Sequence, residues 1–257
     1  MTSPERFYVY GLVAAGQRLD PAALGTGVGG AAVTLRGEGA LQALVSSVDA
    51  GEVAQTRRNL LAHTALLERV MAQATVLPVR FGTVAPGEAA LNACISTNQA
   101  AFSAAMAAID GKVELGVKAS WREGVVFAEI IASDANLARL RNRLRDRPAS
   151  ETYYERVELG RQIEQALAKR RTADAEAILA ELAPLADGEA ELKTLDDDMV
   201  LNRAFLVSRA NEPQFDARMR SLSESREGRM VFRYVGPVPP YNFVQLRADW
   251  QMGAAQP

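Results

Sequence analysis

Three prolines within four residues near the C-terminus restrict the fold of this chain more than any other feature. The segment Gly236-Pro237-Val238-Pro239-Pro240-Tyr241-Asn242-Phe243-Val244 lacks three backbone N–H donors and has three fixed φ angles. It can therefore join neither a helix nor the middle of a sheet. We expect it to run extended, as a stiff polyproline-like segment that holds Tyr241 and Phe243 in fixed positions.

The composition is typical of a soluble globular protein in a reducing compartment. The chain has 257 residues, of which 48% are hydrophobic and 23% charged, so it is long enough for one large or two small domains. The single cysteine, Cys94, excludes an internal disulfide. Residues 1–6 do not resemble a signal peptide, and no window reaches the roughly 20 apolar residues of a membrane helix. We expect a cytoplasmic protein without a membrane partner.

Residues 1–110 are predicted to form an α+β domain. Strands are expected at 7–13 and 75–80, a hairpin at 31–36 and 41–48, and helices at 60–74 and 88–109. This order of elements favours a mostly antiparallel sheet with helices on one face.

Residues 111–257 are predicted to form a second α+β domain, after a break at Asp110-Gly111. Strands are expected at 112–121, 192–194, 200–207 and 230–235, a helix before Pro148, and another at 213–222. The apolar run at 125–131 fits a strand or a helix equally well. Residues 152–186 fit two helices, with Thr172 as the second N-cap, or one long broken helix equally well, because the apolar rhythm stalls at residues 169–171. They predict a coiled-coil-like arm. The arm would pack on its own domain or on a partner.

The sequence offers no residues for catalysis or for a cofactor. His63 is the only histidine and lies on an apolar helical stripe, and neither a catalytic base nor a zinc site can be assembled from it and Cys94. The run Asp196-Asp197-Asp198 lacks the spaced glutamate of a calcium loop. We therefore predict a partly buried structural His63, a core Cys94, a solvated acidic turn, no metal and no enzyme activity.

Two further segments argue against nucleotide or nucleic-acid binding. The glycine-rich residues 25–30 lack the Lys-Ser/Thr of a P-loop. The alternating arginines from Arg139 to Arg147 scatter around a helix, and only Arg139, Arg143 and Arg147 share a face. With a net charge of −2 and no stacking aromatics recognised nearby, we expect no nucleic-acid partner.

Two segments supply candidates for a protein-interaction surface. In residues 78–83 a proline stiffens a strand and a glycine ends it, which fixes Arg80 and Phe81 beside a turn. Phe81 then either packs in the core, with Arg80 in an internal ion pair, or contacts a partner. Tyr241 and Phe243 either clamp the C-terminal strand onto the core or form an apolar binding surface. Arginine and aromatic residues most often dominate interface energetics, so all four remain candidates.

The proline-rich segment closely resembles the Gly-Pro-Trp-Pro-Pro-Tyr-Ser-Phe-Val signature of the gas vesicle GvpF/GvpL family, with Val238 in place of the tryptophan. Other segments are similar to blocks of the same family in the same order. They are residues 8–13, 76–84, 113–118 with Trp121, and 202–207. The resemblance therefore extends over most of the chain.

The resemblance implies an N-terminal modified ferredoxin-like domain and a C-terminal α+β domain with coiled-coil-like helices. It also implies an accessory or minor structural protein of gas vesicles, which binds the principal shell protein GvpA and other accessory proteins during early assembly. The alternatives are a small-molecule-binding protein or enzyme on a ferredoxin-like scaffold, or a general chaperone for apolar proteins. An F-type or L-type role and the oligomeric state stay open from the sequence.

Overall fold

The computed structural model describes residues 5–49 and 52–244, which form two compact units. The first unit contains the residues up to Glu114 together with the segment from Gly236 onwards, and the second is Leu115–Val235. This division differs from the expected domains 1–110 and 111–257, because the proline-rich segment lies in the first unit. Pro239, Pro240 and Val244 are buried there, and this burial explains why the chain returns.

The first unit is built on a five-stranded sheet whose recorded strand pairs are all antiparallel. The strands are β1 (Arg6–Ala14), β2 (Thr34–Arg36), β3 (Leu41–Val48), β4 (Val76–Pro78) and β5 (Val84–Ala85). Their order is β2-β3-β1-β4, and β5 also pairs with β1. The predicted hairpin is confirmed by β2 and β3, in which Leu35 lies opposite Leu44. The register of β1 against β3 shifts between Val9 and Gly11.

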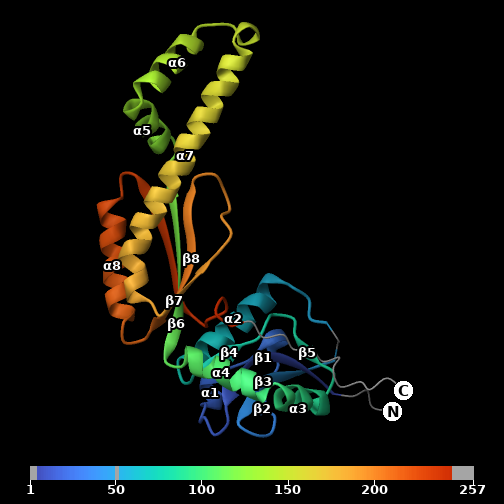
Figure 1. The fold of residues 1–257 in the computed structure, drawn as a ribbon. Helices are drawn as coiled ribbons and strands as arrows, with labels where there is room; N and C mark the ends of the chain where they lie inside the picture. The colour runs from blue at the N-terminus through green and yellow to red at the C-terminus, as the bar shows by residue number, and fades with distance from the viewer. Residues whose placement is uncertain (1–4, 50–51, 245–257) are drawn as a thin grey trace. The chain divides into compact units, whose positions relative to one another are not determined.

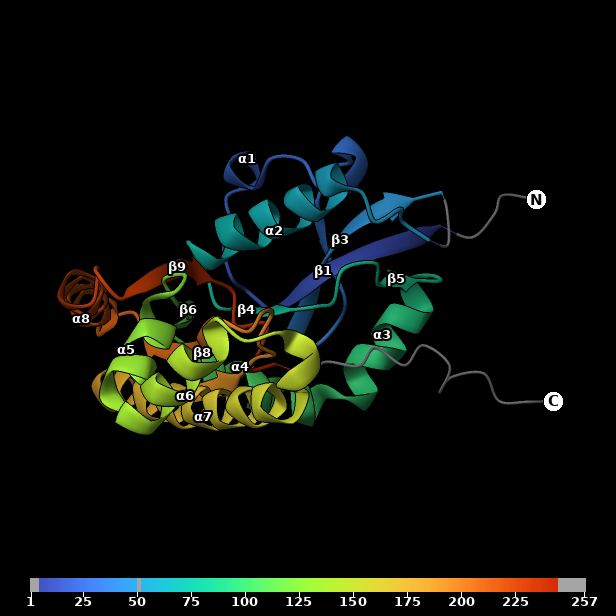
Figure 2. The ribbon, with the colours of Figure 1, turned by 90° about the horizontal axis from the view of Figure 1, so that it is seen from above.

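Helices cover both faces of this sheet. They are α1 (Pro21–Leu24), α2 (Arg57–Met71), α3 (Glu88–Thr97) and α4 (Gln99–Ile109), with a 3-10 turn, η1, at Val28–Gly30. Figure 2 shows α1 and α2 on one side of β1 and β3, and α3 and α4 on the other. The expectation of helices on one face was wrong, because every residue from Phe7 to Val13 is buried and both faces of β1 need cover. The helix expected at 88–109 is interrupted at Asn98, whose side-chain amide donates to the carbonyl of Cys94 (2.9 Å).

The second unit contains a four-stranded sheet in the order β7-β8-β6-β9. Its strands are β6 (Lys112–Trp121), β7 (Gly188–Glu191), β8 (Met199–Ser208) and β9 (Met230–Val238). The C-terminal end of β6 lies beside the starts of β8 and β9. The N–H of Trp121 donates to Asp198 O, just before β8, and the N–H of Arg122 donates to Arg229 O, just before β9 (both 2.9 Å). Adjacent strands therefore run in opposite directions. The strand expected at 192–194 was misplaced, and β7 lies just before it.

One long helix, α7 (Tyr153–Leu182, 30 residues), connects the parts of the second unit. The other helices are α5 (Val125–Ser133), α6 (Ala135–Arg145) and α8 (Glu212–Ser225), with 3-10 turns η2 (Ala149–Glu151) and η3 (Ala183–Leu185). Figure 1 shows α5 and α6 beside the first half of α7, and α8 and the sheet beside its second half. Thr172 does not cap a second helix, because its hydroxyl donates to the carbonyl of Ala168 (3.2 Å) one turn earlier. The open choice at residues 125–131 is settled as helix.

The proline-rich segment is a strand followed by a turn. Pro237 lies in β9, at the edge of the sheet, where a missing N–H is tolerated. Beyond Val238 the chain turns, because the N–H of Tyr241 donates to Pro239 O (2.7 Å) and that of Phe243 to Pro240 O (3.2 Å). The expected extended course was therefore wrong for residues 239–243, since proline carbonyls still accept hydrogen bonds. Among residues 5–49 and 52–244, no helix is both long and apolar enough to cross a bilayer.

Candidate functional site

Arg80 and Phe81 lie in a tight turn between β4 and β5. The carbonyl of Arg80 accepts bonds from both the N–H (3.3 Å) and the hydroxyl (2.7 Å) of Thr83. Gly82 has a φ of +86°, which glycine adopts without strain. The turn is also fixed to β1, where the N–H of Val9 donates to Thr83 O (2.9 Å). It is therefore a rigid support for the two predicted site residues.

Tyr8, Tyr10, His63 and Phe81 form an aromatic cluster, and Phe81 lies on its outer side. Its ring lies 5.9 Å from that of Tyr8 and 5.6 Å from that of His63, both edge to face. Tyr8, Tyr10 and His63 are buried, whereas Phe81 is half-buried. One side of Phe81 thus packs in the core, as one sequence interpretation expected, and part of the ring stays exposed.

A hydrogen-bond chain fixes the cluster. The N–H of Gly82 donates to Tyr8 Oη (3.3 Å), which lies 2.9 Å from His63 Nδ1. When the proton of His63 is on Nε2, the Tyr8 hydroxyl donates to Nδ1, and the buried Nε2 has no hydrogen-bond partner among the described residues. Burial lowers the pKa of His63 to about 4, although the nearby backbone of Val79 opposes the shift, so the ring is neutral at pH 7. His63 is a structural residue, as its helical stripe predicts, and it is more fully buried than expected.

Tyr10 ties the same strand to the glycine-rich loop. Its hydroxyl lies 3.0 Å from Ser46 Oγ and accepts the N–H of Val28 (2.7 Å). Burial raises the pKa of Tyr10 above its usual value, so the phenol stays protonated and can also donate. The loop at residues 25–30 therefore has a structural function.

Arg80 is exposed and makes no ion pair with any residue that the structure describes. The internal ion pair considered from the sequence is therefore absent from this part of the chain. Exposed apolar side chains lie on the helix that covers the cluster, since Leu60 is 36% and Leu61 59% exposed on α2. Leu60 lies one helical turn before His63. Leu61 lies about 160° around the helix from His63, so only Leu60 is on the side of α2 near Phe81. We call Leu60, Arg80 and Phe81 the α2 surface.

The C-terminal candidates, Tyr241 and Phe243, lie in the same unit as the aromatic cluster. Asn242 holds the buried carboxylate of Glu114, donating to it from its backbone N–H (2.8 Å) and its side-chain amide (2.5 Å). Burial raises the pKa of Tyr241 to about 12, and the carboxylates of Glu68 and Glu114 act in the same direction. The phenol also contributes to the raised pKa of Tyr8. Tyr241 thus lies between α2 and β6.

Of the two predicted segments, the structure places the one with Phe81 and Gly82 against Tyr8. Phe81 contacts its ring, and Gly82 donates to its hydroxyl. Phe243 is half-buried, and nothing in the structure joins it to the α2 surface. The importance of Tyr8 and Tyr10 was missed from the sequence, although their alternate positions on a strand place them on one face.

The second unit contains a hollow of about 460 Å³ at the ends of β6 and β8. Its charged lining residues are Lys118, Arg122, Glu123, Asp196, Asp198 and Arg233. Basic and acidic groups are equally represented, so the lining defines no single class of ligand. In residues 5–49 and 52–244, no group of three His, Cys, Asp or Glu side chains is arranged to hold a metal ion.

The chain matches the family model described as "Gas vesicle synthesis protein GvpL/GvpF" over residues 6–245. Gas vesicle protein F of Streptomyces sp. (strain CB03234) is 33% identical to it over 245 residues, which are 93% of this chain and 99% of that protein. The crystal structure of the gas vesicle protein GvpF from Anabaena sp. PCC7120 is similar, with a TM-score of 0.83 at 25% identity, over 95% of this chain and 99% of that chain.

The fold is also similar to the crystal structure of gas vesicle protein GvpF from Microcystis aeruginosa. The TM-score is 0.77 at 23% identity, over 94% of this chain and 99% of that chain. The similarities therefore cover both units and are not limited to the proline-rich segment.

Proposed function

This chain belongs to the gas vesicle synthesis protein GvpL/GvpF family, and on that premise we propose that it binds the principal shell protein, GvpA, during early vesicle assembly. The family consists of gas vesicle proteins, which are of a structural or accessory kind. Other accessory gas vesicle proteins are its further expected partners. It would act in the cytoplasm and at the growing vesicle.

The physical basis is the apolar surface of an unassembled shell subunit. A subunit with one gas-facing side exposes apolar area before it polymerises, and such area drives aggregation. A soluble partner that covers this area would keep the subunit competent and allow ordered addition. The partner itself needs apolar side chains that are exposed but held rigidly.

The α2 surface meets this requirement and is the observation that carries the proposal. Leu60 is 36% exposed, Phe81 is half-buried on a fixed turn, and Arg80 is exposed without an ion pair among the described residues. Aromatic and arginine side chains on a rigid support are the groups that most often contribute strongly to interfaces. We therefore assign shell-protein binding to the first unit.

The test is co-expression with the principal shell protein, followed by affinity capture and size-exclusion chromatography. We expect a soluble complex with the wild-type chain and its loss in the double variant Leu60→Ser/Arg80→Glu. Leu195→Ser is the matched control, because Leu195 is 66% exposed but lies in the second unit. A complex that survives the double variant, or that only the control variant disrupts, would refute the assignment.

Two other functions predict different results in the same assays. A general chaperone would also prevent aggregation of an unrelated apolar protein, whereas an assembly factor would be selective. A small-molecule-binding protein would use the hollow of about 460 Å³ in the second unit. Nucleotides or divalent cations well above their Kd would then raise the melting temperature, since a ligand at about 100 times Kd adds about 2.7 kcal/mol of stability.

A further inference from the structure

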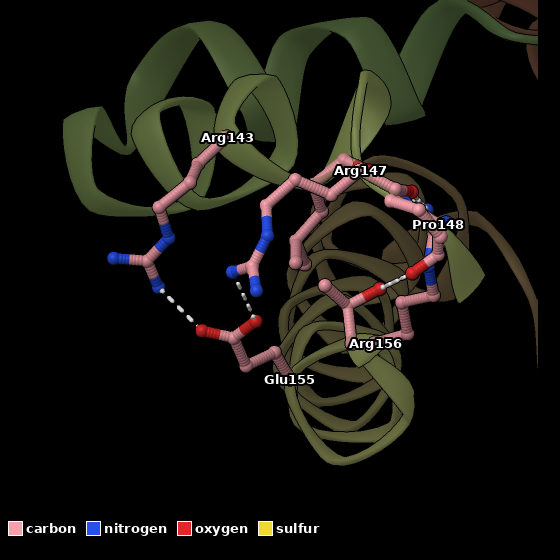
Figure 3. Close-up of polar contacts among 7 residues, drawn as sticks. Arg143, Arg147, Pro148, Glu155 and Arg156 are labelled. Carbon is pink, nitrogen blue, oxygen red and sulfur yellow. Dashed lines mark hydrogen bonds and ion pairs between the residues drawn. The ribbon is translucent and has the colours of Figure 1, made fainter. Parts of the chain in front are cut away.

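The outer end of the helical arm is locked by a polar network. The guanidinium of Arg156 donates to Leu144 O (2.7 Å) and Arg147 O (3.0 Å), at and just beyond the C-terminal end of α6. Such carbonyls have no partner within their own helix. Arg156 also donates to the hydroxyl of Thr152 (3.0 Å), which in turn donates to Pro148 O (2.9 Å). Figure 3 shows these contacts, which fix α6 relative to the start of α7.

Large apolar side chains are exposed directly beside this network. Tyr153 is 64%, Tyr154 85% and Val157 54% exposed, and Tyr154 is the most exposed large hydrophobic residue in the described part of the chain. The two tyrosine rings contact each other edge to face at 5.4 Å. Tyrosines on a rigid support lose little conformational entropy when a partner covers them.

Positive charge surrounds the same site. The sequence of α6 contains four arginines and no acidic residue. Arg143 and Arg147 share a single carboxylate, Glu155, at 3.3 and 3.2 Å (Figure 3). Arg139, on the same face of α6, bonds only to neutral groups of its own helix among the described residues. The arginines therefore exceed the carboxylates that compensate them, in a chain whose net charge is −2.

We propose that this arm tip, formed by Tyr153, Tyr154, Val157 and the arginines of α6, binds an acidic protein segment that carries large apolar side chains. The apolar side chains would cover the tyrosines, and the carboxylates would pair with the arginines. Val157 adds exposed aliphatic area beside the tyrosines, which the side chains of a protein segment would cover and a phosphate backbone would not. The site lies in the second unit, so it is separate from the proposed shell-protein surface.

The first experiment selects peptides from a displayed library of random sequences, each about 12 residues long, on the immobilised full-length chain. We expect enrichment of peptides rich in Asp and Glu that also contain Leu, Phe or Trp. The same selection on the variant Tyr153→Ser/Tyr154→Ser should lose this enrichment. Both tyrosines are exposed, so the melting temperature of the variant should equal that of the wild type.

The second experiment measures the Kd of the most enriched peptide by fluorescence anisotropy. We expect at least about a tenfold weaker Kd for the double tyrosine variant and about a threefold to tenfold weaker Kd for Arg139→Glu. Arg220→Glu and Leu195→Ser are matched controls, because both residues are exposed elsewhere in the second unit and should leave the Kd unchanged.

Three results would overturn the proposal. The selected peptides could lack acidic residues, or they could bind the double tyrosine variant as tightly as the wild type. A single-stranded RNA of about 20 nucleotides or phosphatidylserine vesicles could also bind the arm tip more tightly than the peptide, which would identify a different class of partner.

Discussion

The Tyr10 hydroxyl occupies the space that a side chain at position 27 would need. A Cβ atom at Gly27 would lie 2.0 Å from the Tyr10 hydroxyl and 3.0 Å from Ser46 Oγ. The φ of Gly27 is −94°, so the side chain is excluded by space and not by backbone conformation. The glycine-rich loop therefore owes this glycine to packing against β1.

We expect Gly27→Ala to reduce stability by about 1–3 kcal/mol, because the buried phenol must move and lose its hydrogen bonds. Thermal unfolding followed by circular dichroism measures the effect. Gly228→Ala is the control, since nothing lies within 4 Å of a Cβ at that position. Equal melting temperatures for the two variants would show that Tyr10 adjusts at no cost.

Tyr241 is predicted to act as a clamp for the C-terminal segment. Tyr241→Ala should lower stability by roughly 2–4 kcal/mol, because the packing of the ring between α2 and β6 is lost. Tyr241→Phe keeps the ring and should stay within about 1 kcal/mol of the wild type. Unchanged stability of Tyr241→Ala together with lost shell-protein binding would instead assign the ring to an interface.

His63 makes stability depend on pH. Its pKa is lowered from 6.5 to about 4 in the folded protein, so the unfolded chain binds the proton more tightly. The stabilisation is therefore complete above pH 6.5 and is lost as the pH falls towards 4. The raised pKa of Glu114 acts in the opposite direction, so a variant is needed to isolate the histidine.

The measurement is urea unfolding at about pH 7 and about pH 4.5, for the wild type and for His63→Gln. The wild type should lose roughly 2–3 kcal/mol more than the variant on acidification. His63 is the only histidine, so no other imidazole contributes. An identical pH dependence of the two proteins would contradict a buried neutral ring.

At the scale of elements, α7 is continuous although its sequence has a polar interruption. Arg171 lies over the Trp121 ring at 5.5 Å and donates to Asp197 O (2.5 Å), so a residue that stalls the apolar rhythm still packs on the second unit. Asp174 accepts the indole N–H of Trp121 at 2.8 Å. These polar contacts fix α7 to the second unit near Arg171, where apolar periodicity alone predicted a break in the helix.

Gly160 is a weak point in the exposed part of this helix. A Cβ there would meet nothing within 4 Å, and its backbone is helical. We therefore expect Gly160→Ala to stabilise the chain by about 0.5–1 kcal/mol, through the higher helix propensity of alanine. Ala168→Gly, an exposed change in the same helix, should lower the melting temperature by a similar amount. A lower melting temperature for Gly160→Ala would indicate that the arm needs flexibility at this position.

At the scale of the whole molecule, the first unit is formed by two distant parts of the chain. We propose that residues 1–114, joined to residues 236–257 by a short Gly/Ser linker of about four residues, fold without the second unit. The joined protein keeps the contact between Glu114 and Asn242 and the packing of Tyr241. It should therefore unfold cooperatively, at a higher temperature than residues 1–110 alone.

Circular dichroism melts of the two proteins measure this difference, and the co-expression assay tests their function. Both should retain shell-protein binding, because both contain Leu60 and the turn with Arg80 and Phe81. Binding by residues 111–257 alone would refute the assignment of shell-protein binding to the surface around Arg80 and Phe81. Equal melting temperatures would show that the C-terminal segment adds no stability to the first unit.

Local patterns in the sequence predicted the individual elements well. The opening strand, the hairpin of β2 and β3, α2 and β8 all follow from alternation or helical spacing within a few residues, because backbone preference and side-chain periodicity are local properties. The same reasoning identified His63 as a structural residue, although it is more fully buried than its stripe predicted. The resemblance in ordered blocks also predicted the family, which the match over residues 6–245 establishes.

Tertiary structure decided what no local pattern specifies, which is the surface that each element covers. Burial of β1 on both faces, the return of residues 236–244 to the first unit and the packing of Phe81 on Tyr8 all join residues far apart in the chain. Exposure of Tyr153 and Tyr154 was equally hidden, because aromatic residues at a helix start suit a core as well as a surface. Long-range packing selects among such alternatives, since burial depends on which distant side chains are available as partners.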